Sequence, residues 1–110
     1  MHDHKRELDR ARALLPRDEQ LSDLADLFKL FGDFTRMKIL FSLSQGELCV
    51  CAIAELIGME QSAVSHQLKK LKTANLVLAR REGKTVLYRL ADSHVHDVIA
   101  VGFAHLMEEN

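Results

Sequence analysis

The spacing of apolar residues changes along this chain from a helical period to a strand-like one, immediately after Asn75. Before that point apolar side chains recur every three or four residues, which predicts amphipathic helices. The predicted helices cover residues 3–14, 19–31, 35–43, 51–57 and 61–73. After Asn75, two short apolar runs at residues 76–78 and 86–88 flank the charged turn Arg81-Glu82-Gly83-Lys84. This pattern predicts a β-hairpin with glycine in its turn.

Helical spacing returns after the hairpin and predicts a closing helix whose first turn Asp92 or Ser93 can cap. Two short helices joined at Gly58-Met59-Glu60, then a hairpin and a last helix, make a winged helix-turn-helix plan, mainly α with a small β-hairpin. A chain of 110 residues is the size of one compact domain. We therefore expect residues 1–110 to form a single domain, with residues 1–18 as an N-terminal arm or helix.

The formal net charge of -1 conceals two segments of opposite sign. Residues 61–91 hold a single acid, Glu82, among seven bases: Lys69, Lys70, Lys72, Arg80, Arg81, Lys84 and Arg89. Residues 92–110 hold four acids and no lysine or arginine. The basic segment can bind phosphate and the acidic segment can bind a cation. The alternative is that both segments are ordinary solvated surfaces, and the charge distribution taken alone favours this alternative.

Several classes of protein are disfavoured by what the sequence lacks. No apolar run is long enough to span a membrane, and MHDHKRELDR has no hydrophobic run of the kind found in secretory signals, so we expect a cytoplasmic protein without membrane contact. A glycine-rich phosphate loop, an H-E-x-x-H motif and a G-x-S-x-G motif are all missing. We therefore expect no enzymatic activity and no small-molecule substrate.

The second helix of the helix-turn-helix is the expected DNA-reading element. Such a helix lies in the major groove with its N-terminal side chains on the base edges. The candidates for base or phosphate contacts there are Gln61, Ser62, Ser65, His66 and Gln67. The candidates for phosphate contacts are Lys69, Lys70 and Lys72, then Arg80, Arg81 and Lys84 of the wing, and Arg36 at a helix start. The expected partner is double-stranded operator DNA.

The run ELCVCAIAELIGMEQSAVSHQLKKLKTANLVLARREGKTVLYRL resembles the ArsR/SmtB family of metal-sensing repressors. The resemblance extends over roughly residues 20–108, and its most specific parts are ELCVC, SAVSHQLKKL and the REGK turn. It implies a dimeric winged-helix protein that occupies an operator until an inducer, usually a metal ion, weakens its binding to DNA.

The closing helix carries four potential metal ligands, with Asp92 and His94 at its start and His105 and Glu108 near its end. Eleven residues at 100° each bring His94 and His105 to one face, but they are separated by ~16 Å along the axis. One helix cannot close all four on one ion, whereas two antiparallel helices of a symmetric dimer can, at two equivalent tetrahedral sites. The alternative is a helix with unrelated solvated side chains at each end.

These nitrogen and oxygen ligands suit Zn(II), Co(II) or Ni(II), and Cd(II) is a further candidate. The resemblance adds that zinc-sensing members carry the same Asp-x-His and His-x-x-Glu pattern on their last helix. We therefore expect residues 92–108 to form a dimerisation and metal-binding helix. The expected function is a dimeric repressor that binds a palindromic operator and releases it on binding Zn(II) or a similar ion.

Cys49 and Cys51 form a rival site. In the family, the ELCVC segment followed by aspartate is where sensors of Cd(II), Pb(II), As(III) or Sb(III) place thiolates. Here Ala52 stands where aspartate is usual, and Ala54 stands where arsenic sensors carry another cysteine. No cysteine lies nearer the N-terminus, so His2, Asp3 or His4 would have to complete such a site. We expect a packed, buried cysteine pair. The alternatives are a repressor of the same fold that responds to a soft metal or to thiol oxidation, and a metal buffer or protein-interaction module without specific DNA affinity.

Overall fold

A computed structural model describes residues 2–108, within which the chain forms six α-helices, one short 3-10 helix and three strands. The helices are α1 (His4–Leu14), α2 (Asp18–Phe31), α3 (Phe34–Ser42), α4 (Val50–Ile57), α5 (Gln61–Thr73) and α6 (Ser93–Met107). The strands are β1 (Leu48–Cys49), β2 (Val77–Glu82) and β3 (Thr85–Leu90), and the 3-10 helix η1 spans Leu43–Gln45. The order of the helices and the position of the hairpin confirm the winged helix-turn-helix prediction.

The hairpin is longer and its turn tighter than the sequence indicated. Glu82 pairs with Thr85, so the loop contains only Gly83 and Lys84. Gly83 has φ 63°, a left-handed conformation that a two-residue hairpin loop requires and that glycine adopts without steric cost. Arg81, which the sequence placed in the turn, therefore lies in β2.

A third strand joins the hairpin and was not predicted. Leu48 pairs with Tyr88 and Cys49 with Leu87, which gives an antiparallel sheet in the order β1-β3-β2. Two residues are too few to show an alternating pattern, so this strand can be recognised only from its partner. It fixes the start of α4 to the base of the wing.

The core lies where α3, α4 and α5 pack against the sheet and the first turns of α6. The predicted inward face of α5 is confirmed, because Val64, Leu68 and Leu71 are fully buried. From α6, Val95 and Ile99 complete this core. One face of α5 therefore packs in the hydrophobic core, and the opposite face is left in solvent.

The ends of the helices are closed by local interactions that the sequence indicated. The Asp92 carboxylate accepts a hydrogen bond from the Val95 amide at 3.1 Å and so caps α6. Between α4 and α5, Gly58 has φ 70°, and the Met59 amide donates to the Ala54 carbonyl at 3.0 Å. This left-handed residue ends α4 and turns the chain into α5.

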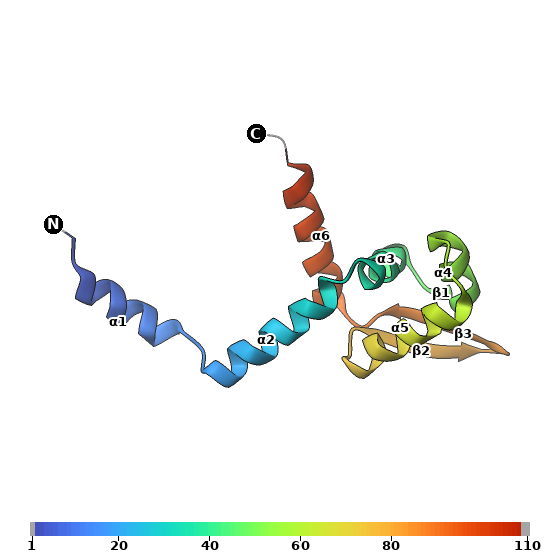
Figure 1. Cartoon of the computed structure of the whole chain (residues 1–110), viewed down its shortest axis with the longest axis horizontal. Coiled ribbons are helices and arrows are strands. Elements are labelled where there is room, and N and C mark those ends of the chain that lie inside the picture. The colour runs from blue at the N-terminus through green and yellow to red at the C-terminus, as the bar shows by residue number, and fades with distance from the viewer. Residues whose placement is uncertain (1, 109–110) are drawn as a thin grey trace.

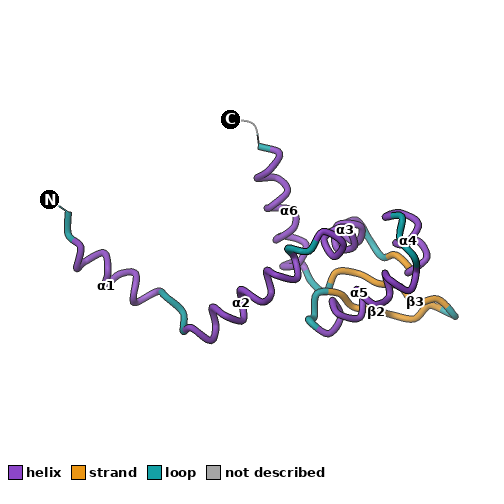
Figure 2. The backbone as a smooth tube through the Cα atoms, in the orientation of Figure 1, coloured by secondary structure: helices purple, strands orange, loops and turns teal. Residues whose placement is uncertain are grey.

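The first two helices extend away from the rest of the molecule (Figure 1). The principal dimensions are 66 × 36 × 21 Å, and α1 contributes no buried residue. Figure 2 shows that α6 likewise projects beyond the sheet from the region where α2 meets α3. Among residues 2–108, no helix combines the length and the apolar character needed to cross a bilayer.

An apolar surface along α2 and α6 is left uncovered by the single chain. The predicted apolar face of α2 is present, but Phe28 is half exposed and only Phe31 is buried. On α6, Val101 and Leu106 are 68% and 74% exposed. Between α3 and α6 lies a groove of about 260 Å³ lined by Phe31, Met37, Phe41, Val98, Ile99, Gly102, Phe103 and Leu106. We call this surface of α2 and α6, with its groove, the apolar face.

Candidate nucleic-acid interface and metal centre

Helix α5 presents the predicted DNA-reading residues on its solvent side. Because Val64, Leu68 and Leu71 fix one face in the core, the residues between them face outward. Those in solvent are Gln61, Ser62, Ser65, His66, Lys69, Lys70 and Lys72, whereas Gln67 is half-buried. Arg81 and Lys84 are exposed at the wing. These groups form a polar, basic surface shared by α5 and the hairpin.

Two of the predicted DNA-binding residues contact each other. The Arg36 guanidinium donates from Nε to the Leu30 carbonyl at 3.2 Å and from Nη1 to Gln67 Oε1 at 3.4 Å. One side chain therefore joins the end of α2, the start of α3 and the middle of α5. This arrangement gives Arg36 a positioning contact to α5, in addition to the phosphate contact predicted from sequence.

Arg80 of the wing is engaged by acidic neighbours. Its Nε lies 2.7 Å from Glu47 Oε2 and its Nη2 lies 2.7 Å from Glu47 Oε1, a bidentate ion pair, and Nη2 also lies 3.0 Å from Glu82. The hydrogen bond from Arg80 lowers the pKa of Glu47, and the same bond raises the pKa of Arg80. Arg81 and Lys84 are thus better placed than Arg80 to offer charge to phosphate.

The Glu47–Arg80 pair gives the wing a pH dependence. Because the pKa of Glu47 is lowered in the folded chain, the pair contributes fully above the ordinary carboxyl value of 4.5 and is lost as the pH falls through the lowered pKa. We expect NMR spectra to show the Arg80 Nε–H losing its hydrogen-bonded shift in that acidic range. In Glu47→Gln this transition should be absent, whereas Glu82→Gln should retain it. A transition that persisted in Glu47→Gln would assign it to another carboxylate.

The prediction that Cys49 and Cys51 form a packed, buried pair is wrong. Cys49 is half-buried and caps α4, its Sγ accepting from the Ala52 amide at 3.4 Å, whereas Cys51 is exposed. The reason is helical geometry: the buried face of α4 is set by Ile53 and Ala54, and Cys51 lies about 200° from Ile53 around the helix. Both thiols are free.

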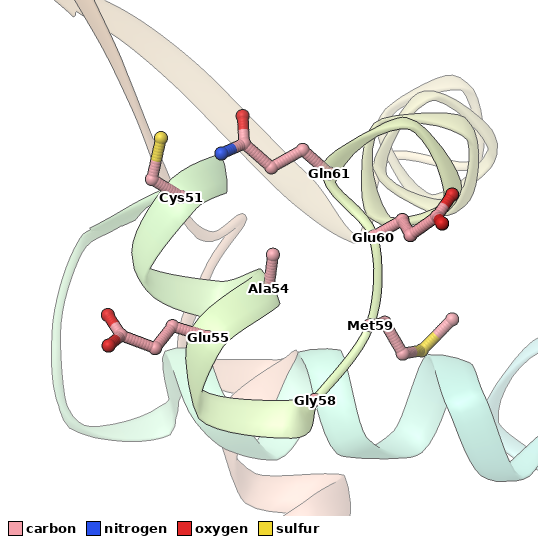
Figure 3. Close-up of a pocket in the computed structure, with 7 residues that line it drawn as sticks. All are labelled: Cys51, Ala54, Glu55, Gly58, Met59, Glu60 and Gln61. Carbon is pink, nitrogen blue, oxygen red and sulfur yellow. The ribbon is translucent and has the colours of Figure 1, made fainter.

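The exposed thiol borders an open pocket between α4 and α5 (Figure 3). The Cys51 thiol and the Gln61 amide lie at the same end of this pocket, while Glu55 and Glu60 point away on either side. A second hollow, beside the wing, is lined by Cys49, Val50, Cys51, Lys84, Thr85 and Val86. The cysteines therefore lie at the start of α4, the first helix of the helix-turn-helix, and next to the wing.

The four predicted metal ligands of α6 form two pairs at opposite ends of the helix. His94 Nδ1 lies 3.8 Å from Asp92 Oδ1, and His105 Nδ1 lies 3.8 Å from Glu108 Oε2. A tetrahedral ion with ligands at 2.0–2.1 Å places neighbouring ligand atoms ~3.3 Å apart, so each pair needs only a small adjustment to share one. Both imidazoles are more than 80% exposed. The donor types and the spacing within each pair fit a divalent ion, with the other half of each site to come from outside the chain.

Sequence reasoning did not identify Glu47 as part of the interface. It pairs with a residue 33 positions away across the sheet, and no local pattern marks such a contact.

The chain matches known proteins over most of its length. The sequence model described as "Bacterial regulatory protein, arsR family" matches residues 33–78, from the start of α3 into β2. A cadmium resistance transcriptional regulatory protein CadC homolog from Staphylococcus aureus is 39% identical over 96% of this chain and 87% of its own. A transcriptional repressor SmtB homolog from a Synechocystis strain is 38% identical over 84% of this chain and 70% of its own.

Solved structures agree with the fold. The solution structure of apo-NmtR has a TM-score of 0.73 and 39% identity, covering 83% of this chain and 77% of that one. A homodimeric winged helix-turn-helix domain, Mb0332 from Mycobacterium bovis, has a TM-score of 0.73 and 35% identity, covering 88% and 96%. These relatives are transcriptional regulators and not enzymes, as the sequence led us to expect. The chain belongs to the arsR family of bacterial regulatory proteins, the ArsR/SmtB repressors.

Proposed function

We propose that this chain is a metal-responsive transcriptional repressor that binds a palindromic operator as a homodimer and releases it on binding Zn(II) or a similar divalent ion. The observation that carries the proposal is the pair of half-sites, Asp92–His94 and His105–Glu108, whose imidazoles are exposed at the two ends of α6. Acting on operator DNA, such a protein works in the cytoplasm.

The apolar face supports a homodimer. Several large apolar side chains of α2 and α6 are exposed, as is common where a surface is covered by another protein, and those of α6 lie on the same helix as the half-sites. Two α6 helices packed antiparallel across a two-fold axis would bring Asp92 and His94 of one protomer to His105 and Glu108 of its partner. One contact would thus cover the apolar face and complete two equivalent four-ligand sites.

The same dimer explains how ligand binding and DNA binding can be linked. In a symmetric dimer the two α5 helices must lie about one DNA turn apart, ~34–36 Å, to enter successive major grooves. A bound ion supplies a cross-link between the two α6 helices. Because Arg36 connects the end of α2 to Gln67 on α5, a change in the helices at the interface reaches the DNA-reading element directly. By linkage, metal and DNA then weaken each other by the same factor.

The names of relatives support a metal ion as the inducer but do not identify which ion it is. One relative is named for cadmium resistance, and a structural neighbour at 31% identity is an antimony-specific transcriptional repressor. The choice of Zn(II), with Co(II), Ni(II) and Cd(II) as related candidates, depends on the imidazole and carboxylate donors of α6.

The test begins with operator fragments selected by the metal-free protein from random duplex DNA. Fluorescence anisotropy should show tight, salt-dependent binding that Zn(II) weakens by roughly 5–150-fold. A Co(II) titration of the reduced protein should give an absorption spectrum of tetrahedral intensity without strong thiolate charge transfer. The proposal fails if DNA affinity is unchanged by every divalent ion tested.

Lys69 and Lys70 are expected to supply phosphate contacts from α5. Their joint replacement by alanine should lower affinity for all duplex sequences and reduce the slope of log affinity against log salt by about 1.8, since each phosphate contact contributes about 0.9. The matched control replaces Lys5 and Lys29, which are exposed on α1 and α2, and should leave the slope unchanged. Equal slopes for the two double variants would place the DNA elsewhere.

A thiol-responsive repressor of the same fold is a second candidate, favoured by the exposure of Cys51. Because Cys51 lies beside Gln61 at the start of α5, a soft metal or an oxidised sulfur there would alter the surface offered to DNA. Under this alternative, oxidant or Cd(II) would release DNA from the wild type and not from Cys51→Ser, and His105→Ala would behave as the wild type.

A further inference from the structure

One ion pair crosses the sheet from the segment before β1 to strand β2. Glu47 immediately precedes β1 and Arg80 lies in β2, whereas the order of the strands is β1-β3-β2. The two side chains therefore reach across β3, and they meet through two charge-assisted hydrogen bonds of 2.7 Å. A bidentate contact of this kind fixes both the distance and the orientation of its partners. It joins two strands that are not neighbours in the sheet.

The register of the hairpin places Arg80 on the face of the sheet that points away from α5. Val77 of β2 is fully buried, and its partner Leu90 packs against the same core, on the side that α5 covers. Because side chains alternate along a strand, Arg81 lies on the side of α5 and Arg80 lies on the opposite side. Neighbouring bases of the wing therefore face in different directions.

The partners of Arg80 differ in how firmly they are held. The Glu47 side chain is 27% exposed, whereas the side chain of Glu82, which lies 3.0 Å from Arg80 Nη2, is 65% exposed. The hydrogen bond from Arg80 and the charge of Arg89 lower the pKa of Glu47, so its carboxylate is ionised at neutral pH. The Glu47–Arg80 pair is thus the better enclosed of the two contacts.

The pair connects the two elements that are expected to contact DNA. Only the two residues of β1 separate Glu47 from α4, the first helix of the helix-turn-helix. Arg80 belongs to the hairpin whose loop carries Lys84. Phosphate contacts from α5 and from the wing have to be made on the same duplex, and such contacts set the register and orientation of a protein on DNA. The position of the wing relative to the helix-turn-helix therefore affects how many of these contacts can form together.

We propose that Glu47 and Arg80 form a clamp that holds the wing in position relative to the helix-turn-helix, so that Arg80 serves DNA binding as a positioning residue and not as a phosphate contact. This inference rests on the DNA-binding part of the proposed function and is independent of the metal. Its consequence is opposite in sign to the effect of charge alone. Removal of the negative charge of Glu47 weakens DNA binding, although it makes the protein more positive.

The test compares two variants that remove the same charge from the same face of the sheet. In full-length, reduced, metal-free protein, Glu47→Gln breaks the clamp, whereas the matched control Glu82→Gln leaves it in place. In anisotropy titrations with the selected operator, Glu47→Gln should bind about twofold to fivefold more weakly than the wild type, as is typical for loss of a partly exposed ion pair. Glu82→Gln should bind at least as tightly as the wild type, because it removes a charge that repels phosphate.

A second set of variants separates positioning from phosphate contact. Arg80→Gln should weaken operator binding as much as Glu47→Gln does, and the double variant should be no weaker than either, because all three lack the same pair. The slope of log affinity against log salt should be unchanged in Arg80→Gln and should fall by about 0.9 per protomer in Arg81→Gln. Residual dipolar couplings should show the hairpin reoriented relative to α5 in Glu47→Gln and not in Glu82→Gln.

The opposite results would overturn the clamp. Tighter operator binding by Glu47→Gln would make Glu47 a competitor of phosphate for Arg80. A slope that fell in Arg80→Gln as much as in Arg81→Gln would make Arg80 a phosphate contact. Wild-type affinity in both single variants would show that the pair does not position the wing. If the wild type binds no duplex, the DNA-binding part of the proposed function fails together with the clamp, whereas failure of release by Zn(II) alone leaves the clamp standing.

Discussion

His105→Ala is expected to abolish the release of operator DNA by Zn(II) while leaving the DNA affinity of the metal-free protein near that of the wild type. His105 is 81% exposed and caps nothing, so its removal disturbs neither the core nor the helix end. On binding metal, the DNA affinity of the wild type should fall roughly 5–150-fold. The DNA affinity of the variant should be almost unchanged by metal. Anisotropy titrations with and without Zn(II) measure both quantities.

His96→Ala is the matched control for this prediction. His96 lies on the same helix, but its ring is about 200° around the axis from His94 and contacts Asp97 at 3.4 Å. It should respond to Zn(II) like the wild type. Asp92→Ala is a poorer test because Asp92 also caps α6, and loss of such a cap costs ~1 kcal/mol. Unaltered release by Zn(II) from His105→Ala would overturn the proposed mechanism.

Leu106→Glu is expected to produce a folded monomer with greatly weakened DNA binding. Leu106 is 74% exposed in the single chain and lines the groove of the apolar face, so a charge there is harmless to the monomer but is buried in the proposed dimer. Loss of ~1.5–3 kcal/mol of apolar burial at each of two symmetric positions raises the dimer dissociation constant on the order of a hundredfold or more. Sedimentation equilibrium and DNA titrations measure the two effects.

Leu56→Glu is the control for the dimer. Leu56 is 65% exposed on α4, which is separated from α6 by α3 (Figure 1). It should sediment as the wild type does, even if the new acid near the helix-turn-helix weakens DNA binding. A thermal unfolding curve like that of the wild type would establish that Leu106→Glu is folded. Persistence of the dimer in Leu106→Glu would place the interface on another surface.

Local sequence patterns were sufficient to predict most of the fold. The spacing of Val64, Leu68 and Leu71 identified both α5 and its buried face, and Gly58 marked the turn before it. These predictions succeed because a helical period and a left-handed glycine are properties of a few neighbouring residues. The position of the basic side chains on the opposite face of α5 followed from the same geometry.

Predictions that depended on a partner distant in sequence were incomplete or wrong. The cysteine pair was expected to be buried, yet Ile53 and Ala54 form the buried face of α4 and leave Cys51 in solvent. Arg80 was expected to be available to phosphate, and its pairing with Glu47 across the sheet could not be read from local composition.

The sequence by itself determined the order of the elements, the helix-turn-helix, the wing and the residue types along α5 and α6. Each of these depends on hydrophobic period, capping and turn residues, which act over a few positions. Only the tertiary structure decided that β1 joins the wing, that Arg36 holds Gln67, and that His2 folds back onto Glu7. It also showed that the apolar face of α2 and α6 is left uncovered, because periodicity indicates which side of a helix is apolar but not what packs against it.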